Sequence, residues 1–310
     1  MIGKIVAVFF CTFFVGVTTS SAQTDSSVFV GKKLITLSEV VVNKNISVPY
    51  FIQRIKEDTS FYKAFRNLHL LSYTSYNDIR MLDKKGRSIA SLQSKTKQLV
   101  QNGCRTMQVL EENVQGNYYD ESKNPNYYTA QMYASLLFTK GKICGEDNIV
   151  AGREFSTAGK KGVEKHKEQL KMLFFNPGKR INGLPFMSNK TAIYDDDIAD
   201  AYDMSLDMDE YNKVSCYIFK QKVKPNYKGK VVVDEMITWL DDKTFEVVAR
   251  NYTLSYDAGV YDFKVQMEVQ MTHHNGLLVP QLIRYNGNWK VIFKKREHGV
   301  FTATIFDIGL

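Results

Sequence analysis

The last hundred residues constrain the fold of this chain most, because apolar and polar side chains alternate there in one run after another. The alternating runs are residues 216–223, 244–254, 262–271, 277–285, 289–295 and 301–306. A period of two is typical of strands with one wet face and one dry face. We therefore expect this part of the chain to form a large sheet.

Turn-forming residues separate these runs. They lie at residues 225–229, 241–243, 257–259, 274–276 and 286–288. The Asn-Gly pairs at 275–276 and 286–287 are strong hairpin signals, because a two-residue primed turn needs positive φ at both central positions. Six strands joined by such turns predict an antiparallel meander.

Alternation gives this sheet a bulky apolar face, made of Phe219, Trp239, Val247, Met267, Val269, Met271, Leu282, Trp289, Val291, Phe293 and Phe301. Apolar residues on an alternating face usually form core, but Met is also the adaptable side chain of shape-tolerant binding sites. A carrier differs from a filled core only in leaving part of the face uncovered. The residues predicted to line such a site on the central strands are Trp239, Val247, Met267, Val269, Leu282 and Trp289.

A family resemblance rests on short runs within these strands. The runs are Cys-Tyr-Ile-Phe-Lys at 216–220, Met-Ile-Thr-Trp-Leu-Asp at 236–241, Tyr-Asp-Phe-Lys-Val-Gln-Met at 261–267, Leu-Val-Pro at 278–280 and Tyr-Asn-Gly-Asn-Trp at 285–289. In pattern and order they resemble the outer-membrane lipoprotein-sorting (Lol-type) half-barrel family, especially its diverged relatives among secreted Bacteroidetes-type proteins. The resemblance implies an α+β fold in which a curved antiparallel sheet wraps around helices and holds acyl chains between them. It contains no catalytic motif, and no family residue is carried over as a ligand contact.

The first 22 residues have the pattern of a secretory signal peptide. Lys4 precedes the apolar run 5–17, and Ser20-Ser21-Ala22 supplies a small-residue cleavage site. This predicts a location in the periplasm or cell envelope. Residues 23–46 are expected to be a flexible segment that can contribute one strand, and residues 47–310 a single half-barrel-like domain.

Helical periodicity appears in two places. Ser47 and Pro49 start a helix over residues 49–66 with an apolar stripe. Turn signals at 83–86 and 102–103 then predict the first strands of the sheet. A helical insertion is expected near 118–178, with helices over 127–138 and 160–175, and it forms either half of the core or a lid over a ligand.

The mature chain would hold Cys104, Cys144 and Cys216, an odd number for an oxidising compartment. At most one internal disulfide can form. A bridge between Cys104 and Cys144 would stabilise the fold by roughly 3–4 kcal/mol through the lost entropy of the unfolded chain. The alternative is that the cysteines are buried as small apolar residues.

Catalytic and cofactor motifs are missing from the sequence: it has no nucleophile elbow, zinc-protease motif, phosphate loop or dinucleotide fingerprint. We therefore predict a protein that is not an enzyme and has no cofactor. The acidic run 195–210 could hold calcium, but acidic runs more often form solvated turns. His273, His274 and His298 could hold zinc, but they do not have the spacing of a local zinc motif.

Lys and Arg number 41 against 33 Asp and Glu, a formal charge of +8. This modest excess is compatible with peripheral contact with an anionic membrane, and nothing predicts nucleic-acid binding. The expected function is an envelope protein that binds a hydrophobic lipid or acylated ligand. The alternative is an envelope interaction or assembly module, whose partner is another envelope protein.

Overall fold

A single large sheet organises the chain. The structure, a computed structural model, describes residues 26–44, 46–149, 173, 175–181, 187, 189–259, 261–291 and 295–309. The strands are β1 (Ser26–Val30), β2 (Lys33–Leu37), β3 (Ser72–Leu82), β4 (Ser88–Gln101), β5 (Cys104–Gly116), β6 (Ile143–Cys144), β7 (Tyr202–Tyr211), β8 (Val214–Val223), β9 (Val233–Asp241), β10 (Val247–Asp257), β11 (Tyr261–His274), β12 (Leu277–Val291) and β13 (Glu297–Gly309). The helices are α1 (Glu39–Asn43), α2 (Val48–Glu57), α3 (Ser60–Asn67) and α4 (Tyr128–Leu137), with short 3-10 turns at Leu68–Leu70, Asp196–Ala201 and Pro225–Tyr227.

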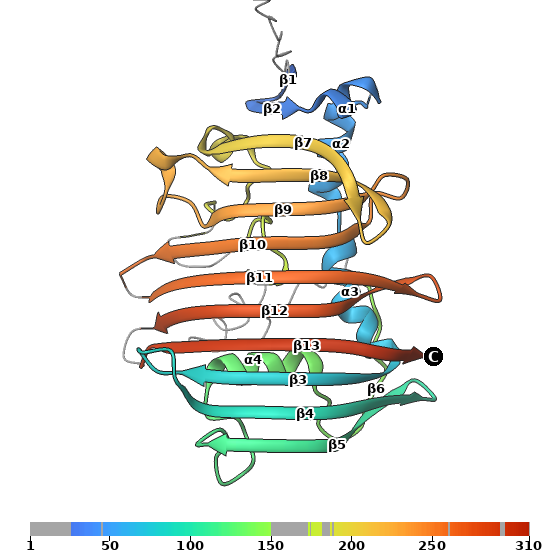
Figure 1. Cartoon of the computed structure of the whole chain (residues 1–310), viewed down its shortest axis with the longest axis vertical. Helices are drawn as coiled ribbons and strands as arrows, with labels where there is room; N and C mark the ends of the chain where they lie inside the picture. The colour runs from blue at the N-terminus through green and yellow to red at the C-terminus, as the bar shows by residue number, and fades with distance from the viewer. Residues whose placement is uncertain are drawn as a thin grey trace, which may run out of the picture.

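All thirteen strands belong to the same open sheet, in the order β1-β2-β7-β8-β9-β10-β11-β12-β13-β3-β4-β5-β6. Strands β7 to β13 follow one another as a meander, and β13 then pairs with β3 along most of its length. Every pair is antiparallel except β2 with β7. The last strand of the chain therefore joins the C-terminal meander to the hairpins near the N-terminus (Figure 1).

The helices α2, α3 and α4 lie on one face of this sheet (Figure 1). In α2, Phe51 packs edge-on against Tyr217 and Phe219 of β8, with ring centroids 5.6 and 5.5 Å apart. Helix α4 packs on the same sheet closer to β5, and its Tyr133 ring centroid lies 4.8 Å from that of Phe301 in β13. The fold is thus the predicted α+β architecture, a curved antiparallel sheet around helices with a helical insertion.

Two local predictions near the N-terminus need correction. The helix expected over 49–66 is two helices, because the chain turns out of the helical conformation at Asp58, whose carboxylate accepts the backbone N–H of Ser60 at 2.9 Å. The segment 23–46, expected to be flexible with one possible strand, contributes two strands, β1 and β2, which pair as a hairpin. Strand β2 also pairs with β7, which lies far along the chain, so the local composition does not reveal this contact.

One predicted turn is also wrong. Residues 286–288 lie inside β12, which continues without a break from Leu277 to Val291. Gly287 pairs with Gly299 there, and a Cβ on Gly287 would come within 1.9 Å of the Tyr285 hydroxyl. Glycine at this position makes room for a side chain, whereas Asn275 and Gly276, at φ 49° and 75°, form the expected hairpin.

Some predictions fall outside the described residues, namely the leader at 1–22 and most of the helix at 160–175. Leu173 and Phe175 from the end of that helix are described, and both are buried. Among the helices that the structure describes, none is long and apolar enough to cross a bilayer.

Candidate functional site

The central strands of the inner face are covered. Val247, Met267, Val269 and Trp289, four of the six residues predicted to bind a ligand, point to this face and are at most 9% exposed. Helix α3 packs over this region, with Phe61 and Tyr252 centroids 6.3 Å apart, and the Asn67 amide donates to the carbonyl of Leu278 at 2.7 Å. These positions therefore belong to the packed core of the ligand-free protein.

The other two predicted residues, Trp239 and Leu282, face the opposite side of the sheet. Trp239 alternates with Thr238 and Leu240, which are buried on the inner face, and it packs against Tyr211. Leu282 pairs with Gln270, next to a bulge that shifts the register before Met271 and Pro280. Because a bulge adds one residue, it reverses which side chains point inward, and alternation counted through it gives the wrong face.

The row of helices ends before the sheet does. On β5 the residues paired with the inner face of β4 are Met107, Val109, Glu112 and Val114. Their partners on β4 are buried, but Val109 is 59% exposed and Val114 37% exposed. Within the described residues, the last long strand thus presents apolar side chains that no helix covers.

A cleft of 760 Å³ lies at this end, between α4 and the inner face of β4 and β5. The helical wall consists of Gln131, Ala134, Ser135 and Phe138, which lie on one face of the helix because they are three, four and seven residues apart. The loops after β5 and after α4 line the two ends of the cleft. The lining residues are Leu92, Ser94, Thr96, Arg105, Met107, Val109, Glu112, Tyr118, Tyr119, Lys123, Asn124, Pro125, Gln131, Ala134, Ser135, Phe138, Thr139, Lys140 and Ile143. The volume falls within the range of small-molecule pockets, about 300–1,000 Å³.

Helix α4 is attached at its start to the strand that carries Glu297. The Glu297 carboxylate accepts the backbone N–H groups of Tyr128 at 2.9 Å and Thr129 at 3.0 Å. The Thr129 hydroxyl accepts the indole N–H of Trp289 at 3.0 Å. Free N–H groups and the positive end of the helix dipole make a helix N-terminus a good site for a carboxylate.

The middle and end of α4 are attached as well. The Tyr133 hydroxyl donates to the Asn77 side chain at 2.6 Å, and the Tyr73 hydroxyl donates to the Leu137 carbonyl at 3.1 Å. Burial raises the pKa of Tyr133 well above 10, so its hydroxyl stays protonated and donating. These hydrogen bonds hold α4 against the sheet, so they favour a fixed wall of the cleft over a mobile lid.

A buried polar network forms one end of the cleft. Arg105, which is 7% exposed, pairs with Glu146 and bonds the Thr139 hydroxyl. Gln98 accepts from Thr139 at 2.8 Å and donates to the carbonyls of Leu68 and Leu71 at 2.7 and 2.8 Å. The charge of Arg105 is therefore balanced within the protein.

Next to this network, Cys104 and Cys144 form a disulfide that joins β5 to β6. Of the two alternatives that the sequence leaves open, the structure has the bridge, and Cys216 is a buried thiol whose pKa is raised to about 11 by burial. The bridge fixes the position where the chain returns from α4 to the sheet.

Two tyrosines line the cleft near its entrance. Tyr118 is 1% exposed, and its hydroxyl has no hydrogen-bond partner within the part of the chain that the structure describes. The Tyr119 hydroxyl donates to Glu112 at 3.2 Å, and burial followed by the Glu112 charge raises its pKa to about 12. Both phenols are thus neutral donors at physiological pH.

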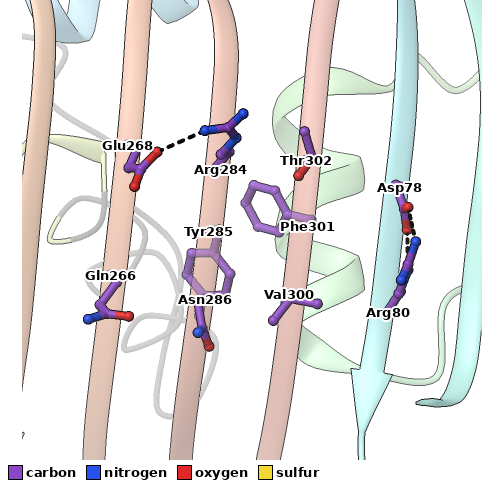
Figure 2. Close-up of a pocket in the computed structure, with 10 residues that line it drawn as sticks. All are labelled: Asp78, Arg80, Gln266, Glu268, Arg284, Tyr285, Asn286, Val300, Phe301 and Thr302. Carbon is purple, nitrogen blue, oxygen red and sulfur yellow. Dashed lines mark hydrogen bonds and ion pairs between the residues drawn. The ribbon is translucent and has the colours of Figure 1, made fainter. Parts of the chain in front are cut away.

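A second hollow, of 460 Å³, lies on the sheet over β11, β12, β13 and β3 (Figure 2). Its charged side chains already pair with each other: Arg284 with Glu268 at 3.2 Å, and Arg80 with Asp78 at 2.8 Å. Figure 2 shows that the Glu268–Arg284 pair bridges two neighbouring strands and that the Asp78–Arg80 pair lies within one strand. A surface whose charges are satisfied internally is a weaker candidate than the cleft.

The two metal hypotheses gain no support from geometry. No three His, Cys, Asp or Glu side chains gather into a metal-binding group among the described residues. In the acidic run, Asp195 pairs with Arg180 at 2.7 Å and Asp196 pairs with Lys33. His273 contacts Glu246 at 3.0 Å, and His298 contacts Asn286 at 3.0 Å, in separate places.

Sequence reasoning missed the cleft although both of its walls were expected. The turn signals at 83–86 and 102–103 lie at the observed ends of β3, β4 and β5, and the helix predicted over 127–138 lies within a few residues of the observed α4. The sequence did not show that β13 pairs with β3. This pairing places α4, which packs on β13, beside β4 and β5. A useful signal was Val109, an apolar residue on the strand that precedes the helix expected over 127–138.

Comparisons with known proteins place this chain in no family. No family model matches it, and no curated protein matches it. Among solved structures, a DUF1329 family protein from Desulfovibrio piger covers 81% of this chain and 91% of its own, at 12% identity and a TM-score of 0.24. A putative outer membrane lipoprotein-sorting protein domain from Vibrio parahaemolyticus covers 83% and 90%, at 8% identity and a TM-score of 0.27. Both TM-scores are below 0.5, so no property of either protein is carried over to this chain.

Proposed function

We propose that this protein is a non-catalytic binding protein of the cell envelope, and that it holds a hydrophobic ligand, a lipid or acylated molecule, in the cleft between α4 and β4–β5. The observation that carries the proposal is the apolar wall of β5, which no helix of the described residues covers and where Val109 is 59% exposed beside a 760 Å³ cleft. Exposed apolar surface of this kind is costly in water and is typical of binding sites.

The energetics suit an acyl chain. Burying ten or more methylenes contributes on the order of 8 kcal/mol before the costs of binding, which is enough for micromolar affinity. The apolar part of the wall is supplied by Leu92, Met107, Val109, Ala134 and Phe138. The cleft is open to solvent at its rim, so a ligand can enter without unfolding the sheet.

Two features support an extracytoplasmic location. The sequence starts with a signal-peptide pattern, and a disulfide between Cys104 and Cys144 persists only in an oxidising compartment. N-terminal sequencing of the secreted form should find a start near Gln23, and retention of Met1 would contradict this location.

Native mass spectrometry of the purified protein, combined with uptake of a fluorescent fatty acid, tests the binding function. Val109→Trp should fill the cleft and abolish uptake while leaving the fold intact. The matched control is Leu110→Trp, at a neighbouring exposed residue that does not line the cleft. Uptake equal in both variants, or no lipid bound to the wild type, would reject the proposal.

An interaction module without a small ligand is the second candidate. It is favoured by Phe29 and Leu34, which face each other across the β1–β2 hairpin and are 71% and 47% exposed. Paired exposed apolar residues on an edge hairpin are typical of surfaces that bind other proteins. This account predicts that Phe29→Ser leaves fatty-acid uptake unchanged but weakens association with an envelope protein.

A further inference from the structure

The entrance of the cleft carries two cations. Lys123 lies in the loop after β5, and Lys140 follows α4 across the opening. Lys140 bonds the Asn124 side chain at 3.4 Å, and the ammonium of Lys123 lies 5.6 Å from the centre of the Tyr119 ring. Both lysines therefore lie around one short stretch of the rim.

Neither lysine forms an ion pair with a carboxylate of the described residues. Two carboxylates near the rim already accept hydrogen bonds, and the pKa of one of them, Asp120, is lowered by the hydrogen bonds of Asn124 and Ser122 and then by the charge of Lys140. Glu112 accepts from Tyr119, and Asp120 accepts the backbone N–H groups of Ser122 and Asn124 at 2.9 and 2.8 Å. Arg105 and Arg284, which also line hollows of this sheet, do have carboxylate partners.

A further polar group lies inside the cleft. The buried Tyr118 hydroxyl has no hydrogen-bond partner within the described residues, and a buried donor without a partner costs about 1–3 kcal/mol. Burial raises its pKa, so the hydroxyl remains a donor. A ligand oxygen could satisfy it only after the ring moves, because the hydroxyl is fully buried.

We propose that the ligand of this cleft is an anionic amphiphile, with its carboxylate or phosphate between Lys123 and Lys140 and its acyl chain against Met107, Val109 and Phe138. This inference rests on the proposed binding function and specifies its ligand class. Paired lysines favour an anion over a neutral head, because each adds a charge-assisted contact at the rim.

Displacement of the uncharged dye N-phenyl-1-naphthylamine from the full mature protein tests this ligand class. Dodecanoate, dodecyl phosphate and dodecanol share one chain length, and each is used below its micellar concentration. Both anions should displace the dye at about tenfold lower concentration than dodecanol, and added salt should reduce this preference. The order of the two anions then identifies the head group.

Two double variants complete the experiment. Lys123→Gln with Lys140→Gln should abolish the preference for anions, so that all three ligands displace the dye at similar concentrations. Lys84→Gln with Lys85→Gln removes the same charge from the exposed β3–β4 turn and should keep the preference. Equal affinity for the three ligands in the wild type, or a preference that survives the first variant, would overturn the inference. Failure of all three ligands to bind would instead overturn the binding function on which it rests.

Discussion

Replacement of Glu297 by Gln should release the start of α4 from the sheet. The carboxylate accepts two backbone N–H groups of the helix, at 2.9 and 3.0 Å, and the Thr129 hydroxyl at 3.3 Å. Tyr127, at the N-cap position, offers no side-chain hydrogen bond of its own, so Glu297 supplies the cap from a distant strand. In Gln one of the two carboxylate oxygens is replaced by an NH2 group, so one of the two backbone N–H groups would face another donor.

The magnitude follows from these contacts. Hydrogen bonds to a charged group contribute about 1.5–3 kcal/mol, and a carboxylate at a helix N-terminus adds about 0.3–1 kcal/mol. Because the amide keeps one acceptor, we expect Glu297→Gln to lower the free energy of unfolding by about 2–3 kcal/mol. Gly299→Ala should act in the same direction, since a Cβ there would lie 2.6 Å from the Thr129 methyl group.

Urea unfolding followed by circular dichroism measures this change. Glu235→Gln, on the exposed side of β9, is the matched control and should alter stability by less than about 0.5 kcal/mol. An unchanged midpoint for Glu297→Gln would refute the account of how α4 is attached. The same variant should also weaken ligand uptake, because α4 is one wall of the cleft.

Three further predictions concern single side chains. Tyr118→Phe should raise the free energy of unfolding of the ligand-free protein by about 1–3 kcal/mol, because it removes a buried donor that has no partner within the described residues, whereas Tyr133→Phe should lower it by about 1 kcal/mol in urea unfolding. Phe65→Asp should destabilise by several kcal/mol, since the ring is 4% exposed and packs 5.3 Å from Phe175; an unchanged melting temperature would show that α3 is peripheral. Burial and then the Arg105 charge lower the pKa of His69 below 6.5, so the unfolded chain binds this proton more readily. The stability that the neutral ring provides should be lost as the pH falls from about 6.5 through the lowered pKa, and a pH series should be flatter in His69→Gln.

Local patterns predicted the sheet well because each strand alternates and each hairpin has its own turn chemistry. The Asn275-Gly276 turn was predicted for the right physical reason. The same dipeptide at Asn286-Gly287 misled, because glycine there accommodates the Tyr285 ring and not a turn. A short sequence cannot distinguish these two uses of glycine.

The orientation of side chains was harder to predict than the strands themselves. Leu282 would point inward by alternation from Leu278 and Pro280, but the bulge beside Gln281 reverses the face. At Trp239 the inner position is taken by the neighbouring Thr238, whose hydroxyl accepts from buried Arg250 at 3.1 Å. Buried polar residues such as Thr238 therefore interrupt the apolar alternation from which the inner face of a strand is predicted.

Methionine methyl NMR tests the central claim, that the open part of the inner face lies beside β5 and not over the central strands. Met107 lines the cleft, whereas Met267 lies under the helices and is 1% exposed. The protein is labelled with [methyl-13C]methionine, its signals are assigned with Met107→Leu and Met267→Leu, and a nitroxide-labelled fatty acid is added. We predict strong broadening of the Met107 signal and little change at Met267. Broadening of Met267 with Met107 unaffected would contradict the account.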